Sequence, residues 1–428
     1  MATDHVLPGS APARTSAAPP RGSTAPAPAG TAPARVTAPA AAAPQRPRTP
    51  RLDSLTGLRF PAALAVFAHH AFLPIPPLRL LGDDGTENRL AHWFAQAGGL
   101  GVSFFFVLSG FVLTWSARDR DTTTAFWRRR FVKIYPTYVV TWALALSLFA
   151  LYYTSAGVAV ANLFMVQVWW PEYMTNFSVD APSWSLAVEA VFYLCFPMLL
   201  KAFRRIDPGH LKYWITGAIA AVVATPALAY ALFPSDPRIP SGHDSSVSQY
   251  WFSYVLPPVR MVDFALGILV ALAVKHGRWR NIGMIWSSLL LAAGYWLTFH
   301  VPYLYGQRAV MILPIVLLIA ATALADVEGR TSLFRNRTMV WLGEISFAFY
   351  LLHYITMCSL RWALGADAMY SLPVTLAMLA GVGVVTVLMS WGLFAWVENP
   401  LVRRFSRSRS KSQSQSQSQS QSQGTKAG

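Results

Sequence analysis

Charged residues are scarce in this sequence. Asp, Glu, Lys and Arg make up 13% of its 428 residues, which is about half of the share found in soluble domains. Hydrophobic residues make up 54%, and the mean hydropathy is +0.38. Apolar runs follow one another along the chain, each close to the ~20 residues that a helix needs to cross a bilayer. The composition therefore excludes an ordinary soluble domain and predicts a multi-pass helical membrane protein.

Cysteine is almost absent as well. Cys195 and Cys358 both lie in apolar runs, so we expect no disulfide framework. The first 50 residues are rich in Ala, Pro and Thr and hold no apolar core, which argues against a secretory signal peptide. There is no P-loop and no GxGxxG after an expected strand, nor a cluster with metal-ligand spacing. We therefore expect no bound metal, and an activated group that comes from a soluble donor or a lipid.

Composition divides the chain into three parts. Residues 1–51 are rich in Ala and Pro and residues 406–428 carry a Ser-Gln repeat, so both are predicted to be disordered tails. Residues 52–405 are predicted to form one all-α membrane domain, a polytopic bundle of about ten transmembrane helices. The expected spans lie at roughly residues 55–76, 99–117, 134–154, 183–203, 212–233, 252–274, 282–300, 308–326, 340–362 and 373–397. The segment 156–172 is apolar but short, and we expect an interfacial or re-entrant piece there.

The net charge of +16 comes from basic residues that gather at alternate ends of the apolar runs. By the positive-inside rule this distribution places both termini in the cytoplasm, in agreement with an even number of spans. Residues 155–182, in a loop expected on the far side, contain no Lys or Arg. We therefore expect a protein of the cell (plasma) membrane that has the lipid bilayer as its partner and does not bind nucleic acid. The sequence leaves the oligomeric state open.

Two ionisable residues stand out in the first expected span. Arg59 and His70 are eleven residues apart, so a helix places them on one face and about 16 Å apart along its axis. An unperturbed histidine has a pKa near 6.5, which suits His70 as a general base for a hydroxyl, and Arg59 suits an anionic group that enters from the cytoplasmic side. The alternative is a snorkelling arginine and a histidine bonded within the bundle. His69 lies roughly 80° away on the same helix, and its role is open.

Three consecutive arginines, Arg128, Arg129 and Arg130, precede the third expected span. They form either a phosphate-binding patch for a nucleotide-bearing cofactor or charge that sets the topology and touches anionic lipid. Glu189 lies in the fourth span, where a buried carboxylate needs a partner. It either orients a histidine or accepts a proton, or it forms an interhelical hydrogen bond to a Tyr or Trp.

Further polar residues in the apolar runs are expected to contact the substrate or to be structural. Arg260 and Asp263 are three residues apart, which favours an ion pair within one helix. Ser109 lies in an aromatic-rich run, where small residues favour close helix packing over a nucleophilic role. His353 is either a second candidate base or a structural histidine, and Tyr350 precedes it at helical spacing.

Taken together, these motifs resemble the acyltransferase 3 family of integral-membrane O-acyltransferases. Seven pieces occur in the family's order across about residues 52–405, and their combination is far more specific than any one of them. They are LTGLRF followed by HH, GVSFFFVLSGFVL, FWRRRFVKIYP, PSWSLAVEAVFYLCFP, RMVDFALG, LGEISFAFYLLHY and VENPL. The fourth piece contains Trp184, another candidate for a substrate-contacting or structural residue.

The resemblance implies transfer of an acyl group, often acetyl, from acyl-CoA to a hydroxyl of a sugar, a surface glycan or a glycosylated natural product. It implies acyl-CoA as the donor and no permanently bound cofactor. Arg59 and His70 fit the family's arginine and histidine of the first span, and the arginine run would meet the CoA phosphates. The motifs LTGLRF and FVLTWS most resemble those of family members that acylate macrolides. Ala190 stands where the family often has a second acidic residue, and Asp263 where it commonly has Glu.

The mechanism that fits these residues is a direct, base-catalysed transfer. Acyl-CoA docks from the cytoplasm against Arg59 and the arginine run, and His70 deprotonates the acceptor hydroxyl. The competing function is a polytopic transporter or lipid-linked sugar flippase, which also needs intramembrane charge. No duplicated halves are evident, and the arginine run favours a phosphate-bearing donor. A non-catalytic scaffold would explain neither Arg59 and His70 nor Glu189.

Overall fold

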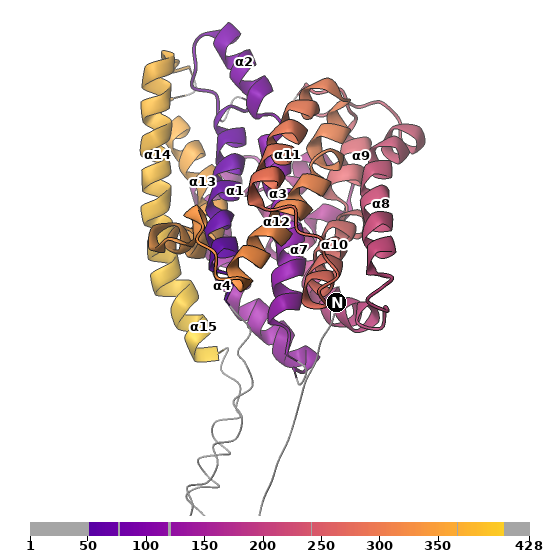
Figure 1. The fold of residues 1–428 in the computed structure, drawn as a ribbon. Coiled ribbons are helices and arrows are strands. Elements are labelled where there is room, and N and C mark those ends of the chain that lie inside the picture. The colour runs from indigo at the N-terminus through magenta and orange to yellow at the C-terminus, as the bar shows by residue number, and fades with distance from the viewer. Residues whose placement is uncertain (1–50, 76–77, 119–120, 241, 366, 406–428) are drawn as a thin grey trace, which may run out of the picture. The chain divides into compact units, whose positions relative to one another are not determined.

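The computed structural model describes residues 51–75, 78–118, 121–240, 242–365 and 367–405 (Figure 1). The two predicted tails, residues 1–51 and 406–428, lie outside this part of the chain except for Arg51. Within the described ranges the regular structure is helical, apart from two isolated β-bridges. The predicted all-α fold class is confirmed.

The helices and short helical turns follow in one order along the chain. They are α1 (Asp53–Ala71), α2 (Asp84–Phe94), α3 (Ala97–Ser116), α4 (Thr123–Leu148), η1 (Ala150–Tyr152), α5 (Ala156–Leu163), η2 (Gln167–Trp169), α6 (Tyr173–Asn176), α7 (Ser183–Phe203), α8 (Leu211–Leu232), α9 (Val247–Tyr250), η3 (Trp251–Val255), α10 (Pro257–Lys275), α11 (Met284–Leu297), η4 (Thr298–His300), η5 (Tyr305–Ala309), α12 (Ile312–Val327), η6 (Leu333–Arg335), α13 (Arg337–Leu364), α14 (Leu372–Leu393), η7 (Phe394–Glu398) and α15 (Asn399–Phe405). In Figure 1, α14 and α8 lie at opposite edges of this bundle, and α1 and α3 lie between them.

Eight helical stretches in the described residues are long and apolar enough to cross a membrane. They are Asp84–Ser116, Thr123–Leu148, Ser183–Phe203, Leu211–Leu232, Val247–Lys275, Tyr305–Val327, Arg337–Leu364 and Leu372–Phe405. The predicted polytopic bundle is therefore confirmed. α1 and α11, which cover two of the ten expected spans, fall outside this set, so the count of ten and the cytoplasmic placement of both termini stay predictions.

Local sequence explains where several helices begin. The side chains of Thr122 and Asn336 accept hydrogen bonds from backbone N–H groups in the first turns of α4 and α13, which is the usual role of a helix N-cap. α4 begins at Thr123 rather than near residue 134, so the arginine run lies on the helix itself. The apolar segment 156–172 breaks into α5 and η2, both too short to span, in agreement with the expected interfacial or re-entrant piece.

Glycines bring the central helices into backbone contact. A Cβ at Gly267 of α10 would lie 2.0 Å from the carbonyl oxygen of Val107 in α3, and one at Gly110 of α3 would lie 2.1 Å from the carbonyl oxygen of Phe264 in α10. Gly343 of α13 is pressed as closely against the backbone of α1. Close approach at small residues is the main way that helices associate inside a bilayer. α3 is thereby held at a fixed distance from α10.

We expect Gly267→Ala to destabilise the protein by about 1–3 kcal/mol, because the added methyl group overpacks the contact between α3 and α10. Gly217→Ala on α8 is the matched control, since a Cβ there meets nothing within 4 Å. The control should be neutral or slightly stabilising, because glycine is a poor residue inside a helix. Thermal unfolding in detergent measures both, and equal melting temperatures for the two variants would contradict the proposed contact.

Candidate active site

Two of the cavities in the described part of the chain are lined by the candidate site residues. The first, of about 480 Å³, is lined by positively charged side chains from α1, α4 and the segments beside α1 and α3, and we name it the cationic cavity. The second, of about 670 Å³, contains both histidines of α1 among many aromatic rings, and we name it the histidine cavity. Arg59 lines the first and His70 lines the second. The two residues therefore lie on one helix but in different cavities.

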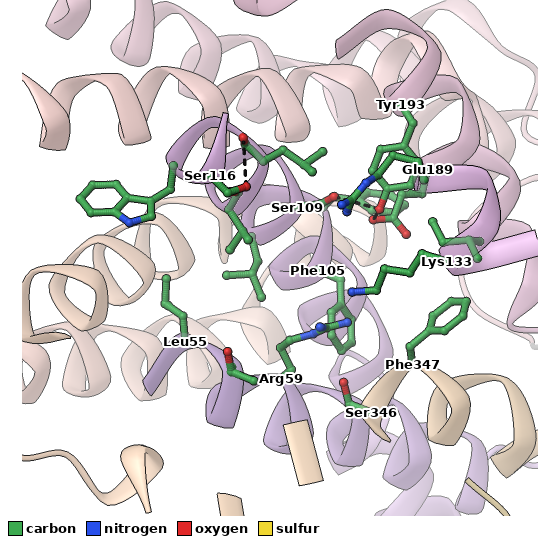
Figure 2. Close-up of a pocket in the computed structure, with 18 of the residues that line it drawn as sticks. Leu55, Arg59, Phe105, Ser109, Ser116, Lys133, Glu189, Tyr193, Ser346 and Phe347 are labelled. Carbon is green, nitrogen blue, oxygen red and sulfur yellow. Dashed lines mark hydrogen bonds between the residues drawn. The ribbon is translucent and has the colours of Figure 1, made fainter. Parts of the chain in front are cut away.

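Five basic residues line the cationic cavity. They are Arg51, Arg59, Arg118, Arg130 and Lys133. Figure 2 shows Arg59 and Lys133 extending from α1 and α4 into the same space, next to Phe105. Among the described residues that line this cavity, Glu189 is the only one with an acidic side chain. The cavity therefore carries an excess of positive charge and suits an anion with several negative groups.

Only one residue of the arginine run reaches the cationic cavity. Arg130 lines it, whereas Arg129 forms an ion pair with Asp121 and Arg128 is exposed. Successive residues on a helix point about 100° apart, so three adjacent arginines on α4 cannot all face one space. Lys133, three residues beyond Arg130, lies on the same face of the helix.

Glu189 lies in the cationic cavity and not beside His70. Its carboxylate accepts a hydrogen bond from the hydroxyl of Tyr193, whose oxygen is 3.3 Å from the hydroxyl of Ser109. Of the alternatives left open for Glu189, this contact is a hydrogen bond to a Tyr, but it lies within α7 and not between helices. Glu189 shares the cavity with Arg130 and Lys133, and a catalytic role for it stays a prediction. In Figure 2, Ser109, Glu189 and Tyr193 form a polar group across the cavity from Arg59.

His70 has two partners at one ring nitrogen. Its Nδ1 is 3.0 Å from the carbonyl oxygen of Val66 and 3.0 Å from Nε2 of His353. A carbonyl oxygen can only accept, so a neutral His70 carries its proton on Nδ1 and its lone pair on Nε2. His353 is fully buried and is not among the residues that line the cavity. The lone pair on Nε2 of His70 takes part in neither contact, and His353 contacts the ring through Nδ1.

Aromatic rings form most of the wall of the histidine cavity. Tyr173, Phe177, Trp184, Tyr250, Tyr254 and Tyr303 make a continuous series of ring contacts along it. His243, in the segment between α8 and α9, stacks on Tyr303, with ring centroids 4.2 Å apart. Burial lowers the pKa of His243 to about 4, so this ring is uncharged at neutral pH. Among the described lining residues Arg361 is the one that is formally charged, so the cavity suits a neutral molecule with flat, apolar faces.

His69 also lines the histidine cavity, and its Nδ1 is 3.2 Å from the carbonyl oxygen of Phe94 in α2. This contact ties α1 to α2, a helix within residues 77–98 that the hydropathy pattern does not reveal. Tyr350 is bound to Ser185 of α7 through its hydroxyl, with an oxygen–oxygen distance of 2.7 Å. Tyr350 lines both cavities.

A buried cluster of charges joins α10 to η5. Arg260 and Asp263 of α10 are fully buried with 3.2 Å between Nη1 and Oδ2, which confirms the predicted ion pair within one helix. Arg308 of η5, also fully buried, places Nε and Nη2 each 2.9 Å from Oδ1 of Asp263. Arg308 is absent from the candidates that the sequence supplied. It opens an apolar run, and the rule that charges within such runs are functional or paired would have found it.

The chain was compared with known proteins. A family model described as an acyltransferase domain matches residues 52–395. The chain belongs to the acyltransferase 3 family. The resemblance seen in the motifs is confirmed, and a transporter is no longer the competing function. With its long apolar helices, this acyltransferase is a multi-pass membrane protein.

Three relatives illustrate how this acyltransferase is similar to others. Acyltransferase MdmB of Streptomyces mycarofaciens is 41% identical over 84% of the chain and 94% of the relative. Peptidoglycan O-acetyltransferase OatA of Listeria monocytogenes is 23% identical over 71% of the chain and 49% of the relative. Putative peptidoglycan O-acetyltransferase YrhL of Bacillus subtilis is 26% identical over 71% of the chain and 48% of the relative. The chain thus spans about half the length of the last two. No solved structure matches it.

Asp263→Asn should destabilise this acyltransferase by about 3–5 kcal/mol, because two buried guanidinium groups would lose their shared counter-charge. Asp244→Asn is the control with the same chemical change: its ion pair with Arg238 is exposed and worth at most about 1 kcal/mol. Thermal unfolding of both variants in detergent gives the comparison. A loss for Asp263→Asn as small as that for Asp244→Asn would show that the buried cluster is not a stabilising element.

Proposed function

We propose that this protein is an O-acyltransferase that moves an acyl group, acetyl or another short chain, from acyl-CoA to a hydroxyl of a sugar or of a glycosylated natural product such as a macrolide. The observation that carries the proposal is the meeting of two cavities of different chemistry along α1. One is cationic and the other contains the candidate base, His70. The cationic cavity suits an acyl donor that carries phosphates, and the cavity with His70 suits an acceptor that carries a hydroxyl.

The donor is bound by charge. CoA carries several phosphate groups. Arg59, Arg130 and Lys133 line the cationic cavity, and the charges of the two arginines act on Lys133. Guanidinium groups bind phosphate with paired hydrogen bonds. In the proposed orientation the protein lies in a bacterial cell membrane and this cavity opens on the cytoplasmic side. Arg51 and Arg118 line the cavity, and both belong to segments that the positive-inside rule places in the cytoplasm.

The reaction is a direct displacement at the thioester. Nε2 of His70 takes the proton of the acceptor hydroxyl as its oxygen bonds to the carbonyl carbon, and the bond from carbon to sulfur then breaks. The proton passes from the imidazolium to the sulfur, so that the products are the ester and free CoA. Holding the two substrates in line supplies much of the rate. His353 keeps the ring in place through Nδ1 and can accept its N–H throughout.

The acceptor is argued from the lining of the histidine cavity. Aromatic rings pack against the flat, apolar faces of sugar and macrocycle rings, and the phenolic hydroxyls among them can bond to the acceptor's own hydroxyls. The name of MdmB describes an acyltransferase and that of OatA a peptidoglycan O-acetyltransferase. The weak similarity to OatA gives a wall polymer little support as the acceptor, and the aromatic lining favours a small glycosylated molecule.

The test is acyl-CoA-dependent ester formation by the purified protein in detergent, read by mass spectrometry with acetyl-CoA and a panel of macrolides and sugars. Detergent removes any membrane gradient, so a product shows catalysis and not transport. His70→Ala should lower turnover by ~10²–10⁴-fold, the range for loss of a general base. His210→Ala, at an exposed position, is the control and should retain full activity.

Failure of the wild-type protein to release CoA or form an ester from acetyl-CoA with any acceptor of the panel would overturn the proposed function. Full turnover by His70→Ala, in a protein that elutes and melts like the wild type, would remove His70 from the mechanism and leave the activity itself standing.

The donor site has its own test within the arginine run. Arg130→Ala should raise the KM for acyl-CoA roughly tenfold, since one charged hydrogen-bonding contact is worth about 1.5–3 kcal/mol. Arg128→Ala removes the same charge two residues earlier, at an exposed position, and should leave KM unchanged. Equal effects of the two substitutions would mean that the run acts through its overall charge and not by lining a binding site.

A further inference from the structure

Two side chains separate the cationic cavity from the histidine cavity. Val102 of α3 and Tyr350 of α13 line both, and they are only 4% and 8% exposed. Trp184 and Ser185, adjacent in α7, lie on opposite sides of the same boundary: Trp184 lines the histidine cavity and Ser185 the cationic one. The wall at this place is therefore one side chain thick.

Tyr350 is fixed at both ends of its ring. Its hydroxyl oxygen is 2.7 Å from Oγ of Ser185 and donates to the carbonyl oxygen of Pro182 at 3.3 Å. The ring meets the edge of Phe105, with centroids 5.9 Å apart, and lies 5.9 Å from the ring of His353. Phe105 itself lies beside the ends of Arg59 and Lys133 in the cationic cavity (Figure 2). The ring therefore stands between the basic residues and the histidine pair.

Val102 cannot move away from Tyr350, because α3 is fixed on two sides. The hydroxyl of the next residue, Ser103, accepts a hydrogen bond of 3.1 Å from Arg260 of the buried charge cluster. On the other side, a Cβ at Gly101 would lie 2.6 Å from the carbonyl oxygen of Ala62 in α1, so α3 and α1 are in backbone contact. The wall that Val102 and Tyr350 form is thus held in a fixed position.

We infer that Val102 and Tyr350 set the length of the acyl chain that this enzyme transfers. The inference rests on the proposed function. The CoA phosphates stay with the basic residues, while the thioester carbon must reach Nε2 of His70 in the other cavity. The acyl group is the leading end of the donor, so it passes these two side chains first, and its chain then lies against them where they line the histidine cavity. A valine and a tyrosine ring in a rigid wall admit acetyl and other short chains and exclude longer ones.

The test compares acetyl-CoA with butyryl-CoA as donors for one acceptor, using the full-length protein in detergent. Val102→Ala removes two methyl groups from the wall and should raise the ratio of kcat/KM for butyryl over acetyl at least about tenfold, the usual effect of one or two methylene groups in an apolar site. Val107→Ala is the matched control. It lies on the same helix, is fully buried and is not among the residues that line either cavity, so it should cost similar stability and leave the ratio unchanged.

Tyr350→Phe gives a second measurement in case Val102→Ala does not yield folded protein. It keeps the ring and its packing but loses the bonds to Ser185 and Pro182, so the ratio should rise in the same direction by a smaller factor. An unchanged ratio in the folded variants, with acetyl transfer by the wild type intact, would overturn the inference and leave the proposed function standing. A wild type without acyl-CoA-dependent transfer would overturn both.

Discussion

The carboxylate of Asp263, shared between two buried arginines, is the interaction on which the arrangement of the bundle depends. It joins Arg260 of the same helix to Arg308 of η5, and Arg260 in turn bonds to Ser103 of α3. The guanidinium of Arg260 also lies over the rings of Phe106 and Tyr254, with its Cζ 4.8 and 5.0 Å from the ring centroids. Charges this far from water are costly unless they are paired. The helices that carry them can therefore meet in few other ways.

α1 separates the two halves of the proposed reaction along its own length. Three turns of helix lie between the basic residue that opens the cationic cavity, Arg59, and the candidate base, His70. In the proposed reaction the phosphates of the donor bind near Arg59, and the proton of the acceptor is taken up by His70, three helical turns away. The base itself remains among aromatic rings, where phosphate groups do not reach it, and its orientation depends on His353 of α13.

Much of the architecture could be predicted from the sequence, because the apolar runs and the basic segments between them mark the helices directly. The separation of Arg59 and His70 followed from helical geometry alone, and so did the pair of Arg260 and Asp263. The contact of His353 with His70 joins residues 283 positions apart, and no periodicity within one helix reveals it. The choice of Arg130 over its two neighbours, and of the cavity that Glu189 lines, depends on how α4 and α7 rotate against the bundle. Packing fixes that rotation only when all helices are present.

Separate linings also have a kinetic consequence. In the proposed mechanism donor and acceptor occupy different cavities that touch at one wall, so neither molecule has to leave before the other can bind. The order of addition is then free, and an excess of acceptor does not block the donor site. A single shared cleft would make the two substrates compete for the same space. Because Val102 and Tyr350 separate the two cavities, the proposed enzyme binds its donor and its acceptor in two independent steps.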